Sequence, residues 1–250
     1  MPKEFTSEPN AQESAVIAGR NAVTEALKKA RPIDCIYILK GADRGSVGKI
    51  IALAKERGVP VKDAAAQKLD ALCGGVVHQG VAAMAACHDF STMEDIFAKA
   101  GDQPPFIIIC DNIEDPHNLG AIIRTAEAAG AHGVIIPKRR GVGLTATVAK
   151  TSAGAVEYMP VVRVANIVST IEELKQKGLW IFCADMDGKP WCSADMGGPI
   201  GIVVGAEGSG VSRLTKEHCD FVVSLPMNGQ VNSLNASVAA AIVIYEAVRQ

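Results

Sequence analysis

Five hydrogen-bonding side chains gather within eight residues, immediately before an apolar helix expected from residue 236 onwards. They are Asn228, Gln230, Asn232, Ser233 and Asn235. The N-terminus of a helix presents unpaired N–H groups and a partial positive charge, which suit a carboxylate or a phosphate. Ser233 or Asn232 could simply cap this helix, but a cap needs only one such side chain. We therefore predict that the remaining side chains line a binding pocket.

A glycine-rich loop, GAEGSG at 205–210, follows an expected strand and precedes an expected helix. Glycines there either form a tight turn or let the backbone approach a ligand closely. Their order is G-x-x-G-x-G, which differs from the dinucleotide-binding G-x-G-x-x-G, and the loop lacks the Lys-Ser/Thr of a P-loop. Because Glu207 would repel a phosphate, the loop suits a ligand that carries amines, hydroxyls or a positive charge.

The helix expected at 118–130, NLGAIIRTAEAAG, places two polar side chains on a largely apolar element. Asn118 is expected to cap its N-terminus. Arg124 lies off the apolar stripe, among small residues at helical spacing. It either pairs with Glu127 three residues later, as a surface arginine does, or reaches towards the ligand.

The elements that must position these residues form an alternating pattern after Pro104 and Pro105. Apolar strands are expected at 106–110, 133–137, 179–185, 200–205 and 221–226, and helices at 118–130, 166–177, 211–217 and from 236 on. Short connections between such elements indicate a doubly wound parallel α/β sheet with helices on both faces. Ligands bind beyond the carboxyl ends of the strands in these sheets, which is where the loops before Asn118, at 205–210 and at 226–233 fall.

A smaller alternating α/β unit is expected before this sheet. It has helices at 16–30, 45–58 and 65–72 and strands at 34–41, 59–61 and 80–86. We predict a flexible leader at 1–15, a first domain at 16–88, a linker at 89–104 and a second domain at 105–250. The linker prediction depends on its polar composition and on the two prolines that close it.

The composition is that of a globular protein, with 48% hydrophobic and 21% charged residues. No apolar run has the length of a membrane span, and the polar start resembles neither a signal nor a transit peptide, which predicts a cytoplasmic protein.

The seven cysteines are interpreted as reduced core thiols, with a catalytic cysteine as the alternative, and the five histidines lack metal-ligand spacing. Residues 1–90 carry 12 Lys and Arg against 10 Asp and Glu, a net +2, and residues 91–250 carry 13 against 17, a net −4.

Taken together and in this order, three motifs resemble those of the SpoU/TrmH family of S-adenosylmethionine-dependent RNA ribose 2′-O-methyltransferases. The first, N-x-G-x-x-x-R-T-A, is met by Asn118, Gly120 and Arg124. The second, G-x-E-x-x-G, is met by Gly205, Glu207 and Gly210. The third, P-M-x-G-x-x-x-S-L-N-x-S-x-A, is met by Pro226, Met227, Gly229, Ser233, Leu234 and Asn235.

This resemblance implies a fold that the periodicity of the sequence alone does not predict. The second domain is expected to be a SPOUT-type sheet tied into a trefoil knot, although generic chain topology would predict no knot. The first domain looks like the small L30e-like domain that binds RNA substrates. The two-domain form is most similar to the RlmB-like subgroup, which methylates a guanosine ribose of 23S rRNA. The resemblance also implies a homodimer formed through the C-terminal domain.

The resemblance further implies roles for individual residues. Arg124 is expected to activate the ribose 2′-hydroxyl, because a guanidinium does not readily give up its proton. Among the remaining catalytic residues, Asn118 and Glu207 would orient Arg124 and the ribose, and Ser233 and Asn235 would fix the pocket through hydrogen bonds. S-adenosyl-L-methionine would be held by Gly205, Gly210, Leu225, Met227 and Leu234, and no metal is expected. Candidate RNA contacts are Arg20, Arg139 and Arg140, each of which has an ordinary alternative as a solvated surface charge.

Three alternatives stay open on the sequence. A tRNA ribose methyltransferase would carry the same motifs, since these address the ribose and the cofactor. A nucleotide-dependent oxidoreductase is disfavoured by the order of the glycines. A catalytically silent RNA-binding relative is disfavoured by the intact Asn118, Arg124, Glu207 and Asn235.

Overall fold

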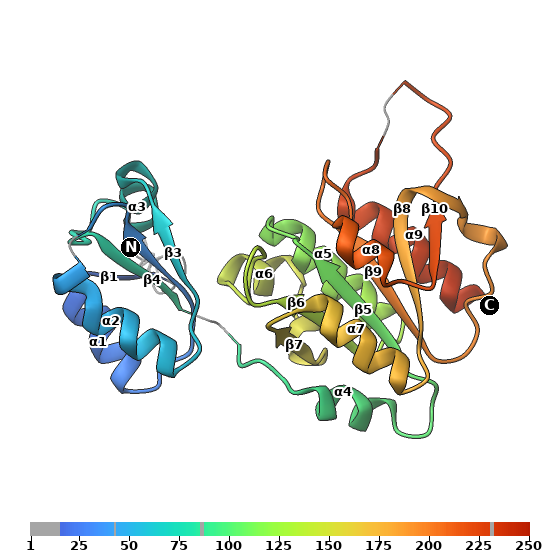
Figure 1. Cartoon of the computed structure of the whole chain (residues 1–250), viewed down its shortest axis with the longest axis horizontal. Helices are drawn as coiled ribbons and strands as arrows, with labels where there is room; N and C mark the ends of the chain where they lie inside the picture. Colours follow the sequence, from blue (N-terminus) through green and yellow to red (C-terminus); the bar gives the residue numbers. More distant parts are fainter. Residues whose placement is uncertain (1–15, 43, 86–87, 231–232) are drawn as a thin grey trace, which may run out of the picture. The chain divides into compact units, whose positions relative to one another are not determined.

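The computed structural model describes residues 16–42, 44–85, 88–230 and 233–250, so the predicted leader at 1–15 lies outside the described residues. The chain divides into two compact units, 1–87 with 144–146, and 88–143 with 147–250 (Figure 1). In chain order, the elements of the first unit are β1 (Val16–Ala18), α1 (Arg20–Lys28), β2 (Ile33–Leu39), α2 (Arg44–Glu56), β3 (Val61–Ala64), α3 (Ala66–Cys73) and β4 (Val81–Ala85).

The first unit has a four-stranded sheet in the order β1-β4-β2-β3. Strands β2 and β3 are parallel, whereas β4 runs antiparallel to both β1 and β2. Leu27, Ile36 and Ile50 are buried in the core that this sheet forms with α1 and α2. Residues 16–18 are a strand and not the start of the predicted helix at 16–30. Gly19, with a φ of 95°, separates the strand from α1, a conformation that few residues other than glycine adopt.

The second unit contains most of the predicted helices and strands. Its elements are α4 (Met93–Ala100), β5 (Phe106–Asp111), α5 (Pro116–Ala128), β6 (Gly133–Pro137), α6 (Ala146–Thr151), η1 (Ala155–Glu157), β7 (Val161–Val164), α7 (Ile167–Gln176), β8 (Trp180–Pro190), η2 (Trp191–Ser193), β9 (Ile200–Gly205), α8 (Arg213–Glu217), β10 (Phe221–Ser224) and α9 (Ala236–Arg249).

A six-stranded sheet in the order β10-β8-β9-β5-β6-β7 forms the centre of this unit, and every pairing in it is parallel. Ile107 and Ile109 of β5 pack with α4 and α7 on one face. Ile108 points to the opposite face because side chains alternate along a strand. Helices α5 and α9 pack against each other on that opposite face (Figure 1). The predicted parallel sheet with helices on both faces is therefore confirmed.

The segment 89–104, predicted to be a linker, belongs to the fold of the second unit. Ser91 forms a bridge with Val162 of β7, and helix α4 follows directly. Thr92 and Asp95 cap α4 by exchanging hydrogen bonds, which is a capping box. Ile96 is fully buried in the core against Ile107. A short amphipathic helix in a polar stretch is hard to distinguish from a linker by composition alone.

Strand β8 is longer than the predicted 179–185 and spans 11 residues. Its pairing with β10 shifts in register between Val222 and Val223. Gly188 lies at this shift, and a Cβ there would meet the Val223 carbonyl carbon at 2.5 Å, so only glycine fits. By the pairing of β8 with β9, Asp185 lies level with Gly205, the last residue of β9, and Asp187 lies beyond it.

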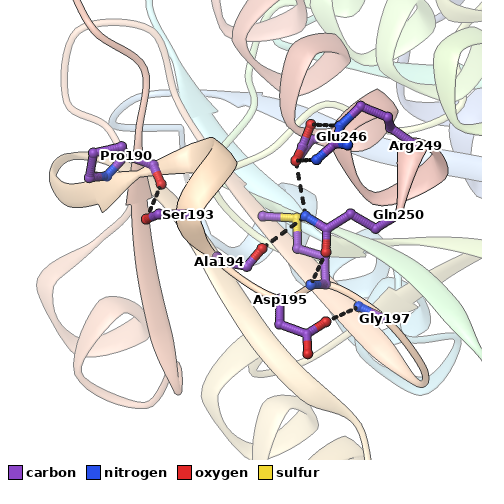
Figure 2. Close-up of polar contacts among 9 residues, drawn as sticks. Pro190, Ser193, Ala194, Asp195, Gly197, Glu246, Arg249 and Gln250 are labelled. Carbon is purple, nitrogen blue, oxygen red and sulfur yellow. Dashed lines mark hydrogen bonds and ion pairs between the residues drawn. The ribbon is translucent and has the colours of Figure 1, made fainter.

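The end of α9 is tied to the segment that follows β8 (Figure 2). The Gln250 side chain accepts a hydrogen bond from the Met196 N–H at 2.7 Å and donates one to the Ala194 carbonyl at 2.9 Å. Gln250 and Arg249 both donate to the buried carboxylate of Glu246. These bonds lower the pKa of Glu246 to about 2, with the Arg249 bond as the largest cause. The carboxylate therefore stays ionised and fixes the last turn of the helix.

Candidate active site

A cavity of about 330 Å³ lies at the carboxyl end of β9, and we call it the first cavity. It is walled by the middle of β8 from 184 to 187, the loop 205–211 and the start of α9. All five residues predicted to hold the cofactor line it, and so does Ser233; the five are Gly205, Gly210, Leu225, Met227 and Leu234. The structure thus brings together in one cavity segments that are far apart in the sequence.

The glycine loop closes on itself at the rim of this cavity. Ala206 and Gly210 exchange two backbone hydrogen bonds of 3.1 and 2.9 Å. A Cβ on Gly205 would lie 2.1 Å from the Gly210 carbonyl carbon, so any larger residue would push the loop open. Gly208 and Gly210 have φ angles of 84° and 65°. The loop is therefore a tight turn, and this turn also forms one wall of the cavity.

A second cavity of about 370 Å³ lies beside the first. It is lined by residues 112–115 and Asn118, from the end of β5 and the start of α5, and by the glycine loop. Ala206, Glu207 and Ser209 line both cavities. Its charged lining residues are all carboxylates: Glu114, Asp115 and Glu207. The two cavities are thus neighbouring compartments with Glu207 between them.

Asn118, Glu207 and Asn235 meet through their side chains, one from each of the three motifs. The Asn235 amide donates to the Asn118 side-chain oxygen at 2.9 Å. Both Asn118 and Asn235 also donate to one Glu207 carboxylate oxygen, over longer distances of 3.4 and 3.5 Å. Asn118 is buried at 5% exposure. A buried amide that is bonded on both sides is held in one orientation. The three residues therefore form a fixed polar group at the shared wall of the two cavities.

The helix caps differ from the prediction. Asp115, not Asn118, caps α5 by accepting a hydrogen bond from the His117 N–H, and Pro116 occupies the first helical position. Proline is favoured there because the missing N–H would be unpaired anyway. Asn235, not Ser233, caps α9 by accepting from the Ser237 N–H, while Asn232 lies outside the described residues. Because Asp115 caps α5, the Asn118 side chain can bond to Glu207 and Asn235 instead. Asn235 both caps α9 and belongs to this polar group.

Arg124 is exposed and lines neither cavity. It follows Asn118 by six residues, which in an α-helix is a rotation of about 240° and a rise of about 9 Å. The two side chains therefore point in different directions from α5. Within the part of the chain that the structure describes, Arg124 makes no ion pair with Glu127 or with any other residue. The structure does not bring Arg124 to the cavities of its own chain.

The first cavity has a charge arrangement that sequence analysis missed. Lys216 of α8 contacts the Asp185 carboxylate at 2.8 Å and that of Asp187 at 3.3 Å. The hydrogen bond to Asp185 is the largest cause of a raised pKa at Lys216, so the lysine stays protonated. No local pattern marks this pair. The one signal was that Asp185 is the last residue of the predicted strand 179–185, at the carboxyl end where ligands bind.

The predicted RNA contacts lie on exposed or partly exposed positions. Arg20, at the start of α1, donates to the Gln79 carbonyl at 3.0 Å. Arg139 and Arg140 are exposed in the segment after β6, and Arg140 has a φ of 59°. The structure places Arg20 in the first unit and the other two in the second.

The cysteines described by the structure carry no disulfide, and four of them are buried: Cys35, Cys73, Cys110 and Cys183. Burial raises the pKa of the Cys110 thiol to about 12, so it stays protonated. Across the described ranges, no group of three or more His, Cys, Asp or Glu side chains is arranged to hold a metal ion. Nor is any described helix long and apolar enough to cross a membrane.

Comparison with protein families assigns the chain to a class. Residues 105–245 match the SpoU rRNA methylase family, and residues 16–90 match a domain described as RNA 2′-O ribose methyltransferase substrate binding. The fold and the match over both units define an RNA-modifying transferase. The chain belongs to the SpoU rRNA methylase family of RNA 2′-O-ribose methyltransferases.

Relatives and solved structures agree with this assignment. The chain is 44% identical to YacO of Bacillus subtilis, named as a TrmH family tRNA/rRNA methyltransferase, over 96% of this chain and 97% of that protein. It is 46% identical to a protein of Staphylococcus saprophyticus with the same family name, over 95% and 96% of the two chains. The fold resembles AviRb of Streptomyces viridochromogenes, solved with AdoMet, with a TM-score of 0.59 and 23% identity over 94% and 89% of the chains. It also resembles the A. aeolicus TrmH/SpoU tRNA modifying enzyme, with a TM-score of 0.53 and 31% identity over 59% and 76%.

Proposed function

We propose that this protein transfers a methyl group from S-adenosyl-L-methionine to the ribose 2′-hydroxyl of a guanosine in 23S rRNA. The observation that carries the proposal is the pair of neighbouring cavities joined by Asn118, Glu207 and Asn235. Direct transfer between two bound molecules requires the donor and the acceptor to lie side by side. The first cavity suits the donor and the second suits the nucleoside.

The first cavity fits the cofactor in shape and in charge. Gly205 lets the loop pack closely enough to form the cavity wall, and the lining carboxylates favour a cation over a phosphate. When bound, S-adenosylmethionine supplies a methyl group on a positively charged sulfur. Gly205, Gly210 and Leu225 would hold it, together with Met227 and Leu234. In the family this cofactor sits in a trefoil knot, and we propose the same knot here, because α9 returns to pack on α5 and β9 after β10.

The residues at the shared wall would hold the ribose in place. Glu207 is free to accept a hydrogen bond from a sugar hydroxyl, and its two amide partners fix its position. Ser233 lines the first cavity and offers a further hydroxyl donor and acceptor there. Arg124 would stabilise the negative charge that develops on the 2′-oxygen as its proton leaves to a nearby phosphate or water. As a guanidinium, it acts as a donor and not as a base.

We infer that Arg124 acts in the site of a second copy of the chain. It points away from its own cavities, and it lies on α5 beside α9, which exposes an apolar stripe of Val238, Tyr245 and Val248 at 48–49%. Such a stripe suits the C-terminal interface of a homodimer. Each copy would then supply the arginine of its partner's site.

Mixed dimers test this arrangement. Arg124→Ala and Glu207→Ala copies, carrying different tags, are co-expressed and purified as mixed pairs. If the arginine crosses the interface, one of the two sites keeps both residues, and the activity is about half that of the wild type. Activity no higher than that of the single variants would place Arg124 in its own chain's site.

The second cavity supports guanosine as the target. Guanine presents two neighbouring donors, N1–H and the N2 amino group, which a carboxylate can accept together. Glu114, Asp115 and Glu207 offer such acceptors, although Asp115 already uses one oxygen to cap α5. Uracil lacks this pair of donors. A tRNA ribose is the second candidate, because relatives carry the name tRNA/rRNA methyltransferase.

The first unit is proposed to bind the RNA. Residues 16–87 carry 11 Lys and Arg against 6 Asp and Glu, a net +5, whereas residues 88–250 carry 13 against 18, a net −5. A positive unit attracts a phosphate backbone. Arg20 lies beside an exposed loop in which Val76 and Val77 are 61% and 77% exposed. Arg139 and Arg140 would contact the RNA nearer the site, and the enzyme would act in the cytoplasm, where its RNA is.

The target is tested with total RNA from a strain that lacks this gene. The RNA is incubated with the protein and methyl-labelled cofactor, and the labelled nucleotides are mapped. Label on one guanosine ribose of 23S rRNA is the expected result. Label confined to tRNA would overturn the target and keep the chemistry. Absence of label from naked RNA and from ribosome precursors would overturn the proposed function.

A further inference from the structure

Lys216 forms a charge bridge at the wall of the first cavity. It is the one cation among the described lining residues, and it contacts Asp185 and Asp187 together. The side chains of Lys216 and Asp185 are only 26% and 10% exposed, whereas that of Asp187 is 84% exposed. The bridge therefore joins α8 to β8 at the cavity wall and is partly shielded from water.

The charged groups of the cavity leave it negative. Three carboxylates, Asp185, Asp187 and Glu207, face one ammonium group, so the lining has a net charge of −2 when all are ionised. The methyl donor has a positively charged sulfur. After transfer this sulfur is a neutral thioether, because the electrons of its bond to the methyl group remain on it. The ligand in the cavity thus carries a positively charged sulfur before the reaction and a neutral one afterwards.

We propose that Lys216 is a specificity-determining residue, which sets how strongly the cavity prefers the cofactor to its demethylated product. By offsetting Asp185 and Asp187, it prevents the carboxylates from holding the cation too tightly and keeps their arrangement fixed. This inference rests on the proposed cofactor and extends it, since it concerns the discrimination between two nearly identical ligands. It makes Lys216 a positioning residue for the binding step.

The ratio of two dissociation constants reports this role. S-adenosylmethionine and S-adenosylhomocysteine differ by one methyl group and one charge, so a general distortion of the cavity weakens both ligands. A change in the local field alters their ratio instead. Removal of a unit charge from a partly solvated site near the ligand changes such a ratio about three- to tenfold. Isothermal titration calorimetry without RNA measures both constants.

Lys216→Met is expected to raise the preference for S-adenosylmethionine over S-adenosylhomocysteine by about three- to tenfold. Lys216→Arg should restore the wild-type ratio within about twofold, because it keeps the charge. Asp187→Asn should lower the preference by about two- to threefold, a smaller effect because this side chain is exposed. Added salt should shrink each of these changes.

Lys175 is the matched control. It contacts Asp220 at 2.8 Å, with side-chain exposures of 31% and 15% close to those of the bridge, but it does not line the first cavity. Lys175→Met is expected to leave the ratio unchanged. If Lys216→Met does not fold, Asp187→Asn decides the matter, since an exposed side chain tolerates the change.

An unchanged ratio in Lys216→Met, or in Asp187→Asn where the first variant does not fold, would overturn the inference. A shift of equal size in Lys175→Met would also overturn it. Failure of the proposed function has a different signature. A wild-type protein that binds neither ligand would overturn the cofactor assignment and this inference with it. An unexpected RNA target would leave both dissociation constants as they are.

Discussion

Replacement of Gly205 by alanine tests how closely the glycine loop must pack. The added Cβ would lie 2.1 Å from the Gly210 carbonyl carbon, 2.2 Å from the Val211 nitrogen and 2.3 Å from the Gly210 oxygen. Ordinary contacts begin near 3.4 Å, so the backbone at 210–211 must move by about 1.3 Å. None of these atoms belongs to a flexible side chain, so the loop itself has to open.

The size of the effect follows from what that movement breaks. The two backbone hydrogen bonds between Ala206 and Gly210 would be lost, at about 1 kcal/mol each. Residual overpacking adds about 1–3 kcal/mol, so the total is roughly 3–5 kcal/mol. Because this loop walls both cavities, we expect a loss of cofactor affinity of at least about 100-fold. Calorimetric titration with S-adenosylmethionine measures that loss, and urea denaturation measures the accompanying change in stability.

Gly208→Ala is the matched control within the same loop. Gly208 has a φ of 84°, but a Cβ there would meet nothing within 4 Å. Its replacement should therefore cost only about 1 kcal/mol of backbone strain. If Gly205→Ala binds the cofactor as well as Gly208→Ala and is equally stable, the close-packed loop is not what shapes the first cavity.

Three further predictions follow from single side chains. Asn235→Ala should lower stability by about 1 kcal/mol through loss of the α9 cap, and should lower the methylation rate by more than that loss explains; an unchanged rate in folded protein would contradict the role of the polar group. If the protein forms the dimer proposed above through α9, Tyr245→Lys should leave it monomeric in sedimentation velocity, and a Tyr245→Lys variant that is still a dimer would argue against α9 as the interface. Glu246 has a pKa lowered to about 2 from 4.5, so it stabilises the fold above about pH 4.5 and loses this effect as the pH falls towards 2. Glu246→Gln should therefore destabilise the protein more at about pH 6 than at about pH 3 in urea titrations, and an equal difference at both would refute the linkage.

The sequence was sufficient for the parts of the fold that repeat a simple pattern. Apolar runs such as 106–110 and 200–205 indicated buried parallel strands, and the polar loops after them marked the edge of the sheet where both cavities lie. The resemblance to the family assigned Asn118, Glu207 and Asn235 to one catalytic site. Their mutual hydrogen bonds join residues 28 to 117 positions apart, which only the structure shows.

Features that depend on distant neighbours were missed or misassigned. Strand β1 is three residues long and exists because it pairs with β4 more than sixty positions later. Asp115 caps α5 because Pro116 occupies the first position of that helix. Asn235 caps α9 because that helix begins at Ala236. In the sequence Lys216 looks like an ordinary surface lysine, because its contact with Asp185 of β8 is formed only in the folded chain.

The most direct test of the account is the effect of Arg124→Ala on the proposed methyl transfer to 23S rRNA, measured as label incorporated at the mapped guanosine in a single turnover. Cofactor affinity is measured in parallel. Because Arg124 lines neither cavity and is exposed, we expect folding and cofactor affinity to remain within about twofold of the wild type. The rate of transfer should fall by about 100- to 1,000-fold, as for the loss of a donor to a developing oxyanion. A variant that methylates the same guanosine at close to the wild-type rate would contradict the proposed mechanism.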